Sequence, residues 1–169
     1  GGEAPLFDGF AYVKQILVAN ISQQFISMDQ QYRPDDPLCD SDKLYTTWQV
    51  VSGTSTSVVV QGNCILFVTF EGNYNNDGAG EFPDAYVCIR MEISTNGSDF
   101  EPVTDTDGKW GTWIANAGSD VTRRKAIYVG DGNHTIRILH RFGAKPSTSS
   151  SLAAFLLTRG TISVQVLKK

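Results

Sequence analysis

His134 and His140 are the only imidazole groups in this 169-residue chain. A catalytic histidine needs a nucleophile or an orienting carboxylate beside it, and no motif such as Gly-x-Ser-x-Gly supplies one. His134 follows a turn, so we expect it to satisfy backbone groups there. His140 shares the apolar side of its segment with Ile138 and Phe142, which predicts a core or interface position. The sequence therefore predicts no catalytic residue and no enzyme activity.

Oxygen-bearing side chains recur between positions 73 and 84 at the spacing of a calcium-binding loop. The candidate metal ligands stand at loop positions 1, 3, 5 and 12: Asn73, Asn75, Asp77 and Asp84. Alternate side chains of such a loop point inward, and the glycine after the third ligand permits the turn. A neutral first ligand weakens the attraction for a divalent cation. We therefore expect an ordinary polar loop with no cofactor, and Ca2+ is the alternative.

Aromatic side chains in polar segments are the candidates for ligand contact. Trp110 and Trp113 lie three residues apart in a loop-rich stretch, and Tyr74 lies in the polar segment just described. Aromatic rings stack against sugar faces and anchor protein interfaces. The alternative is that at least one tryptophan covers the core. The predicted ligand-binding residues are Tyr74, Asp77, Trp110 and Trp113.

Composition narrows the classes of partner. The net charge of −4 argues against nucleic acid or an anionic membrane, because both require a basic face. No run approaches the roughly 20 apolar residues of a membrane helix, so we expect no membrane insertion. The three cysteines, Cys39, Cys64 and Cys88, form no metal-binding cluster. Their odd number favours free thiols, although a Cys64–Cys88 bridge is the alternative.

Short segments with alternating or wholly apolar side chains follow one another along the chain, with no convincing amphipathic helix between them. A short helix over residues 12–28 is the alternative at the N-terminal end, where frequent β-branched and aromatic residues favour strands. The expected strands are 12–18, 24–28, 46–51, 56–60, 64–70, 85–94, 100–104, 126–129, 134–142, 152–157 and 161–167. Asn96-Gly97 is a strong hairpin-turn signal. Many short strands at close spacing predict an all-β fold, a β-sandwich with jelly-roll topology and extra N-terminal strands.

Two of these segments, 64–70 and 152–157, are apolar on both faces. A sandwich strand normally keeps one face in water, so the second face must be covered by loops or by another copy of the protein. We favour another copy, in a trimer. The predicted oligomer interface consists of Cys64, Leu66, Val68, Phe70, Leu152, Phe155 and Leu157.

The segments Gly132–Ile138 and Leu156–Val164 resemble a family of phage-type and bacterial surface jelly-roll domains, in which the second segment is the return strand of a hairpin that the first one opens. These domains are similar in topology to the C1q and tumour-necrosis-factor trimers. The resemblance implies a module at a tail-fibre tip or on a virion or cell surface. The segment Met91–Phe100 is similar to hairpins in galactose-binding-like sandwich modules, which implies binding of a carbohydrate.

The sequence thus predicts residues 1–10 as a flexible arm, in which Gly1-Gly2 resembles a cloning remnant, and residues 11–169 as one jelly-roll domain. The expected function is that of a non-enzymatic structural or receptor-binding module. It is expected to pair with itself as a homotrimer at a virion or cell surface. The alternative is an extracellular carbohydrate-binding module whose partner is a surface glycan, and a small jelly-roll enzyme ranks third.

Overall fold

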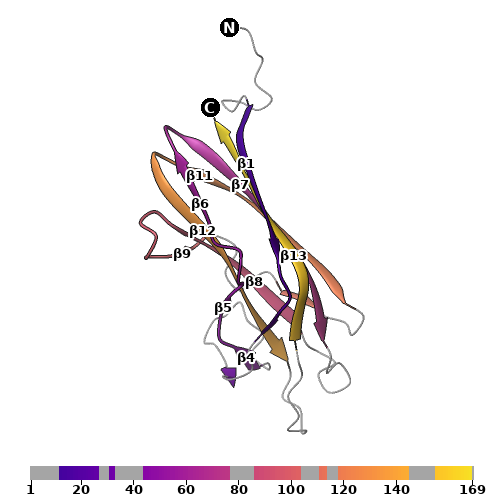
Figure 1. Cartoon of the computed structure of the whole chain (residues 1–169). Helices are drawn as coiled ribbons and strands as arrows, with labels where there is room; N and C mark the ends of the chain where they lie inside the picture. Colours follow the sequence, from indigo (N-terminus) through magenta and orange to yellow (C-terminus); the bar gives the residue numbers. More distant parts are fainter. Residues whose placement is uncertain are drawn as a thin grey trace.

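The protein is an all-β sandwich of two antiparallel sheets (Figure 1). The structure is a computed structural model and describes residues 12–26, 31–32, 44–76, 86–103, 111–113, 118–144 and 155–168. All pairing between strands in these residues is antiparallel. Both sheets bury an inner face against each other, so the predicted fold class is confirmed.

The first sheet is built around the C-terminal strand. Its strands in spatial order are β1 (Tyr12–Ile21), β13 (Phe155–Lys168), β7 (Cys64–Asn76) and β11 (Ser119–Val129), and β2 (Gln24–Ile26) also pairs with β13. β13 lies between β1 and β7 for most of its length. The C-terminal strand is therefore central, with neighbours on both sides.

The second sheet has β8 and β12 at its centre. Its strands are β3 (Gln31–Tyr32), β4 (Leu44–Thr46), β5 (Gln49–Val50), β6 (Thr56–Val60), β8 (Tyr86–Ser94), β9 (Glu101–Pro102), β10 (Gly111–Trp113) and β12 (Gly132–Ala144). β9 and β10 pair with β8, while β4, β5 and β6 pair in turn along the other edge of β12. The last three therefore act as one interrupted strand.

Thr54 bridges the largest interruption in that edge. Its hydroxyl donates to the Val51 carbonyl at 2.7 Å and accepts from the Ile138 backbone amide at 3.0 Å. The Val51 amide also donates to the Ile138 carbonyl at 2.8 Å. A buried side chain thus replaces hydrogen bonds that a continuous strand would have made.

From β7 onward, the long strands alternate between the two sheets, as in a jelly roll. The chain runs from β6 in the second sheet to β7 in the first, returns to β8, and later passes from β11 to β12 and back to β13. Figure 1 shows these long strands in two layers. The Asn96-Gly97 turn was predicted correctly, because β8 and β9 pair across it and Gly97 has φ +80°.

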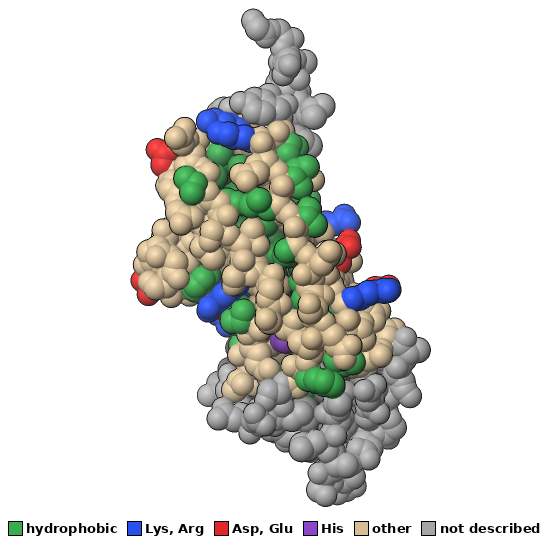
Figure 2. All heavy atoms as spheres, viewed as in Figure 1, with side chains coloured by type: hydrophobic (Ala, Val, Ile, Leu, Met, Phe, Trp, Pro, Cys, Tyr) green, Lys and Arg blue, Asp and Glu red, His purple; other side chains and the backbone are tan. Residues whose placement is uncertain are grey.

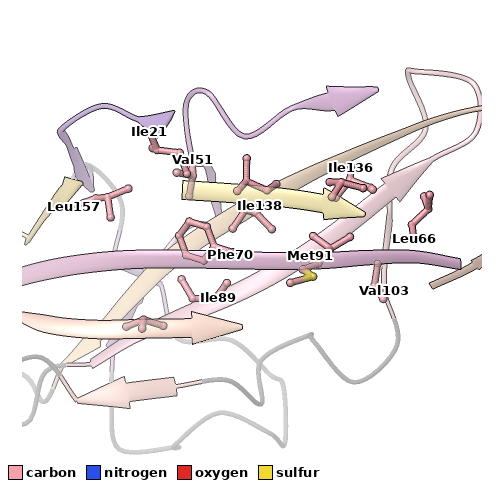
Figure 3. Packing of buried hydrophobic residues seen from close by; sticks show 14 of the residues in the cluster. Ile21, Val51, Leu66, Phe70, Ile89, Met91, Val103, Ile136, Ile138 and Leu157 are labelled. Carbon is pink, nitrogen blue, oxygen red and sulfur yellow. The ribbon is translucent and has the colours of Figure 1, made fainter. Parts of the chain in front are cut away.

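Alternate side chains of the long strands meet between the sheets and form one core (Figure 3). Phe70 and Leu66 from β7 pack with Met91 from β8 and Ile138 from β12, and all four are fully buried. The alternation with period two is what places these residues on one face. Cys64 and Cys88 are buried free thiols, as predicted.

The C-terminal segments differ from the prediction in two ways. Residues 152–157 and 161–167 were expected as separate strands, but β13 runs unbroken from Phe155 to Lys168, with a bulge between Leu157 and Arg159. β12 and β13 do not form a hairpin, since they lie in different sheets. An apolar pattern identifies a strand but does not identify its partner.

The predicted oligomer interface is wrong for five of its seven residues. Cys64, Leu66, Val68, Phe70 and Leu157 are 0–1% exposed within a single chain, because they point between the two sheets. Leu152 lies outside the described residues, and only the backbone of Phe155 is described, within β13. The inward side chains of β7 have no surface to offer to a second copy.

Candidate functional site

Tyr74 is a core residue and not a loop residue. Strand β7 continues to Asn76, so the expected polar loop begins later than predicted. The Tyr74 ring is fully buried, and its hydroxyl shares a 2.9 Å hydrogen bond with Nδ1 of His140 on the facing sheet. The rings meet edge to face, with centroids 5.7 Å apart. The prediction that Tyr74 contacts a ligand is wrong.

The Tyr74–His140 pair is held in its neutral form by burial. Loss of hydration lowers the pKa of His140 to about 3 and raises the pKa of Tyr74 well above its usual range. His140 is 1% exposed, so the imidazole has no access to a substrate or to water. We interpret the pair as a structural link between the two sheets, in agreement with the core position expected for His140.

His134 also has the structural role that the sequence predicted. Its side chain is 4% exposed, and Nε2 lies 2.8 Å from the backbone oxygen of Gly130 in the preceding turn. The two histidines therefore lie in separate environments. Among the described residues, no group of three or more His, Cys, Asp or Glu side chains is placed to hold a metal ion.

Three of the four predicted ligand-binding residues cannot be judged from side-chain positions. Asp77 and Trp110 lie outside the described residues. The backbone of Trp113 pairs with Tyr86 at the edge of the second sheet, but its side chain is not described. A contact between these residues and a ligand stays a prediction.

Two of the predicted calcium ligands, Asn73 and Asn75, lie in the extended strand β7 and point to the same side. Asn73 donates through Nδ2 to Oδ1 of Asp120 at 2.8 Å. Oδ1 of Asn75 is buried and accepts no hydrogen bond from any described residue. Asp77 and Asp84 fall outside the described residues, so the calcium alternative stays untested.

Sequence reasoning missed a charged cluster on the outer face of the second sheet. The buried Glu92 accepts from Nη2 of Arg137 at 2.7 Å and pairs with Nε of Arg90 at 3.3 Å. Arg141 is also buried, with its guanidinium 4.4 Å from the centroid of the Trp48 ring. Only the register, which pairs Glu92 with Arg137, could have revealed this cluster.

One half of the outer face of the first sheet is apolar. Its exposed members on β1 are Val13, Ile16 and Val18, at 44%, 55% and 66%, and Tyr128 on β11 is 76% exposed. The residues that make up this apolar half are Val13, Ile16, Val18, Ile65, Phe67, Tyr128 and Leu167. Cross-strand pairing makes them continuous, because Leu167 lies between Val13 and Ile65, and Ile65 lies beside Tyr128. Figure 2 shows hydrophobic side chains gathered along β1 in the upper part of the molecule.

The other half of the same outer face is a polar groove of about 550 Å3. Four strands line it, and its polar side chains are Asn20, Glu71, Asn73, Asp120, Thr122, Arg159 and Thr161. The register sets Asn20, Thr161, Glu71 and Thr122 in one row and Arg159, Asn73 and Asp120 in the next. Residues that are distant in sequence thus form one polar surface, and no sequence motif predicts it.

Comparisons with known proteins leave the family open. No protein-family model matches the sequence, and no curated protein matches it. None of the described residues belongs to a helix long and apolar enough to cross a membrane.

Three solved structures show a distant likeness to the chain. The structure of infectious bursal disease virus, Gx strain, is 12% identical, with 92% of this chain and 33% of that chain covered at a TM-score of 0.48. Eiger TNF from S. frugiperda is 9% identical, with 91% and 94% covered at 0.43. The CBM22-1 xylan-binding domain of Paenibacillus barcinonensis Xyn10C is 13% identical, with 92% and 96% covered at 0.39. The chain spans about a third of the viral protein. The strand pairing of the chain itself defines its β-sandwich fold.

Proposed function

We propose that this domain is a non-enzymatic binding module that associates with itself, as a homotrimer, at a virion or cell surface. The observation that carries the proposal is the apolar half of the outer sheet face. On this half, Val18 and Tyr128 are 66% and 76% exposed. Phe67 and Leu167 extend the apolar surface over the neighbouring strands β7 and β13. Extended apolar surface of this kind marks interaction sites.

The edge position of β1 supports the same proposal. Among the described residues, β1 pairs only with β13, so its other edge carries backbone groups without a strand partner. An apolar edge strand is a point of unwanted pairing unless something covers it. A second copy that packs on this face would cover both the edge and the apolar side chains.

Both histidines support a binding role over catalysis. Each forms a hydrogen bond within the fold, His134 with Gly130 and His140 with Tyr74. A trimer would present three copies of the loops at one end, and multivalent contact would raise the avidity for a surface through effective concentration.

Light scattering of matched charge variants tests the proposal. Val18→Asp places a charge on the apolar half, while Val59→Asp places one on β6, where the valine is 75% exposed in the other sheet. We expect Val18→Asp to dissociate the assembly and Val59→Asp to leave it intact. Equal masses for both variants and for the unmodified protein would contradict the assignment of this face.

A further inference from the structure

We propose that the polar groove of the first sheet binds a neutral glycan segment. The groove and the proposed self-association involve different side chains of this face. The row between them contains Ser163, Thr69 and Arg124, and Val18, at the β1 end of that row, belongs to the apolar half. The volume of the groove, about 550 Å3, lies within the range of small-ligand sites.

The floor of the groove is fixed by hydrogen bonds. Thr158, at the bulge in β13, donates to the Asn73 carbonyl oxygen at 3.0 Å and to Asn73 Oδ1 at 2.7 Å. Nδ2 of Asn73 donates to Asp120 at 2.8 Å. Polar groups that are already held in position lose little freedom when a ligand binds, which favours affinity.

The rim of the groove supplies polar groups that are not committed elsewhere. In the described part of the chain, the side chains of Asn20, Glu71, Thr122, Arg159 and Thr161 make no hydrogen bond or ion pair with one another or with a neighbour. They offer carboxylate and amide oxygens as acceptors, and guanidinium, amide and hydroxyl groups as donors. A ligand with many hydroxyls can satisfy both kinds.

The distribution of charge selects a neutral ligand. Arg159 and Asp120 lie in the same row of the groove and Glu71 lies in the adjacent row, so neither an anion nor a cation meets a field of one sign. The two central strands beneath the groove, β13 and β7, are each paired on both sides, so the floor of the groove offers no free backbone to an added peptide strand. A neutral sugar, with donors and acceptors on every ring, fits these constraints.

Calorimetric titration of the intact protein tests the proposal. The probes are neutral tetrasaccharides built of xylose, glucose, mannose or galactose, each titrated to millimolar concentration. We expect at least one to bind with micromolar to millimolar affinity. Glu71→Gln and, separately, Thr122→Val should weaken that binding, the former by at least about tenfold, because a hydrogen bond to a charged group is lost. Glu101→Gln, an exposed substitution on β9 of the other sheet, serves as the matched control and should bind normally.

Two results would overturn the glycan site. The first is the absence of binding heat for all four probes with a protein whose melting curve is intact. The second is an equal loss of affinity in Glu71→Gln and Glu101→Gln. The mass in solution is measured on the same samples, so failure of self-association and failure of glycan binding are seen separately.

Discussion

The buried pair of Tyr74 and His140 makes a quantitative prediction for stability in mild acid. The ordinary pKa of histidine is 6.5, and burial lowers the pKa of His140 to about 3 in the folded protein. Between these two pH values, His140 binds a proton in the unfolded chain but stays neutral in the folded protein. Stability from this residue is therefore complete above pH 6.5 and falls as the pH decreases toward 3.

The size of the loss follows from the two pKa values. Between these two pKa values, each decrease of one pH unit lowers the free energy of unfolding by about 1.4 kcal/mol. At pH 5 the folded protein should be about 2 kcal/mol less stable than at pH 7 because of His140 alone. That is a large part of the roughly 5–15 kcal/mol that typically separates a folded domain from its unfolded chain.

Urea unfolding at pH 7 and pH 5, followed by tryptophan fluorescence, measures the effect. The matched variant is Tyr74→Phe/His140→Leu, in which both hydrogen-bonding partners become apolar and no buried group is left unpaired. We expect this variant to lose about 2 kcal/mol less than the unmodified protein on acidification. His134 is present in both proteins, so the comparison isolates the contribution of the Tyr74–His140 pair. An equal loss in both proteins would refute the reasoning, as would NMR evidence that His140 is protonated at pH 6.

Three further predictions concern backbone packing, a buried hydroxyl and calcium. Gly160→Ala should lower the free energy of unfolding by about 1–3 kcal/mol, because a Cβ there would lie 2.7 Å from the Glu71 carbonyl oxygen; Gly130→Ala, which meets open space, should have little effect in the same urea titration. Thr54→Val should cost about 1–3 kcal/mol because the Ile138 amide loses its acceptor, and an unchanged denaturation midpoint would contradict the role of Thr54 as a bridge. Calcium should leave the melting temperature unchanged; a rise of several degrees, abolished by Asp77→Asn, would instead support a site formed by Asn73, Asn75, Asp77 and Asp84.

The positions of most strands could be predicted because alternation is a local signal. In the expected strand 85–94, the apolar residues Val87, Ile89 and Met91 recur at every second position, and all three are fully buried. Partners between strands could not be predicted, since β12 and β13 follow one another in the chain but lie in different sheets. Strand pairing in a jelly roll is a property of the whole chain.

The candidate site was less predictable for the same reason. Tyr74 was placed in a loop because its neighbours are polar, yet those neighbours form the outer face of a strand whose inner face carries Tyr74. The apolar pattern of residues 64–70 correctly indicated an unusual outer face, but the outward members are Ile65 and Phe67. Their alternates point into the core. The polar groove arises only from the register of four strands.

Sedimentation equilibrium of the unmodified protein at micromolar concentration tests the central claim most directly. One chain has a mass of 18.5 kDa, so a homotrimer has three times that, about 55 kDa. We predict a single species at this larger mass that dissociates when Val18 is replaced by Asp. A single species of 18.5 kDa across the concentration range would contradict self-association through the apolar half of the first sheet.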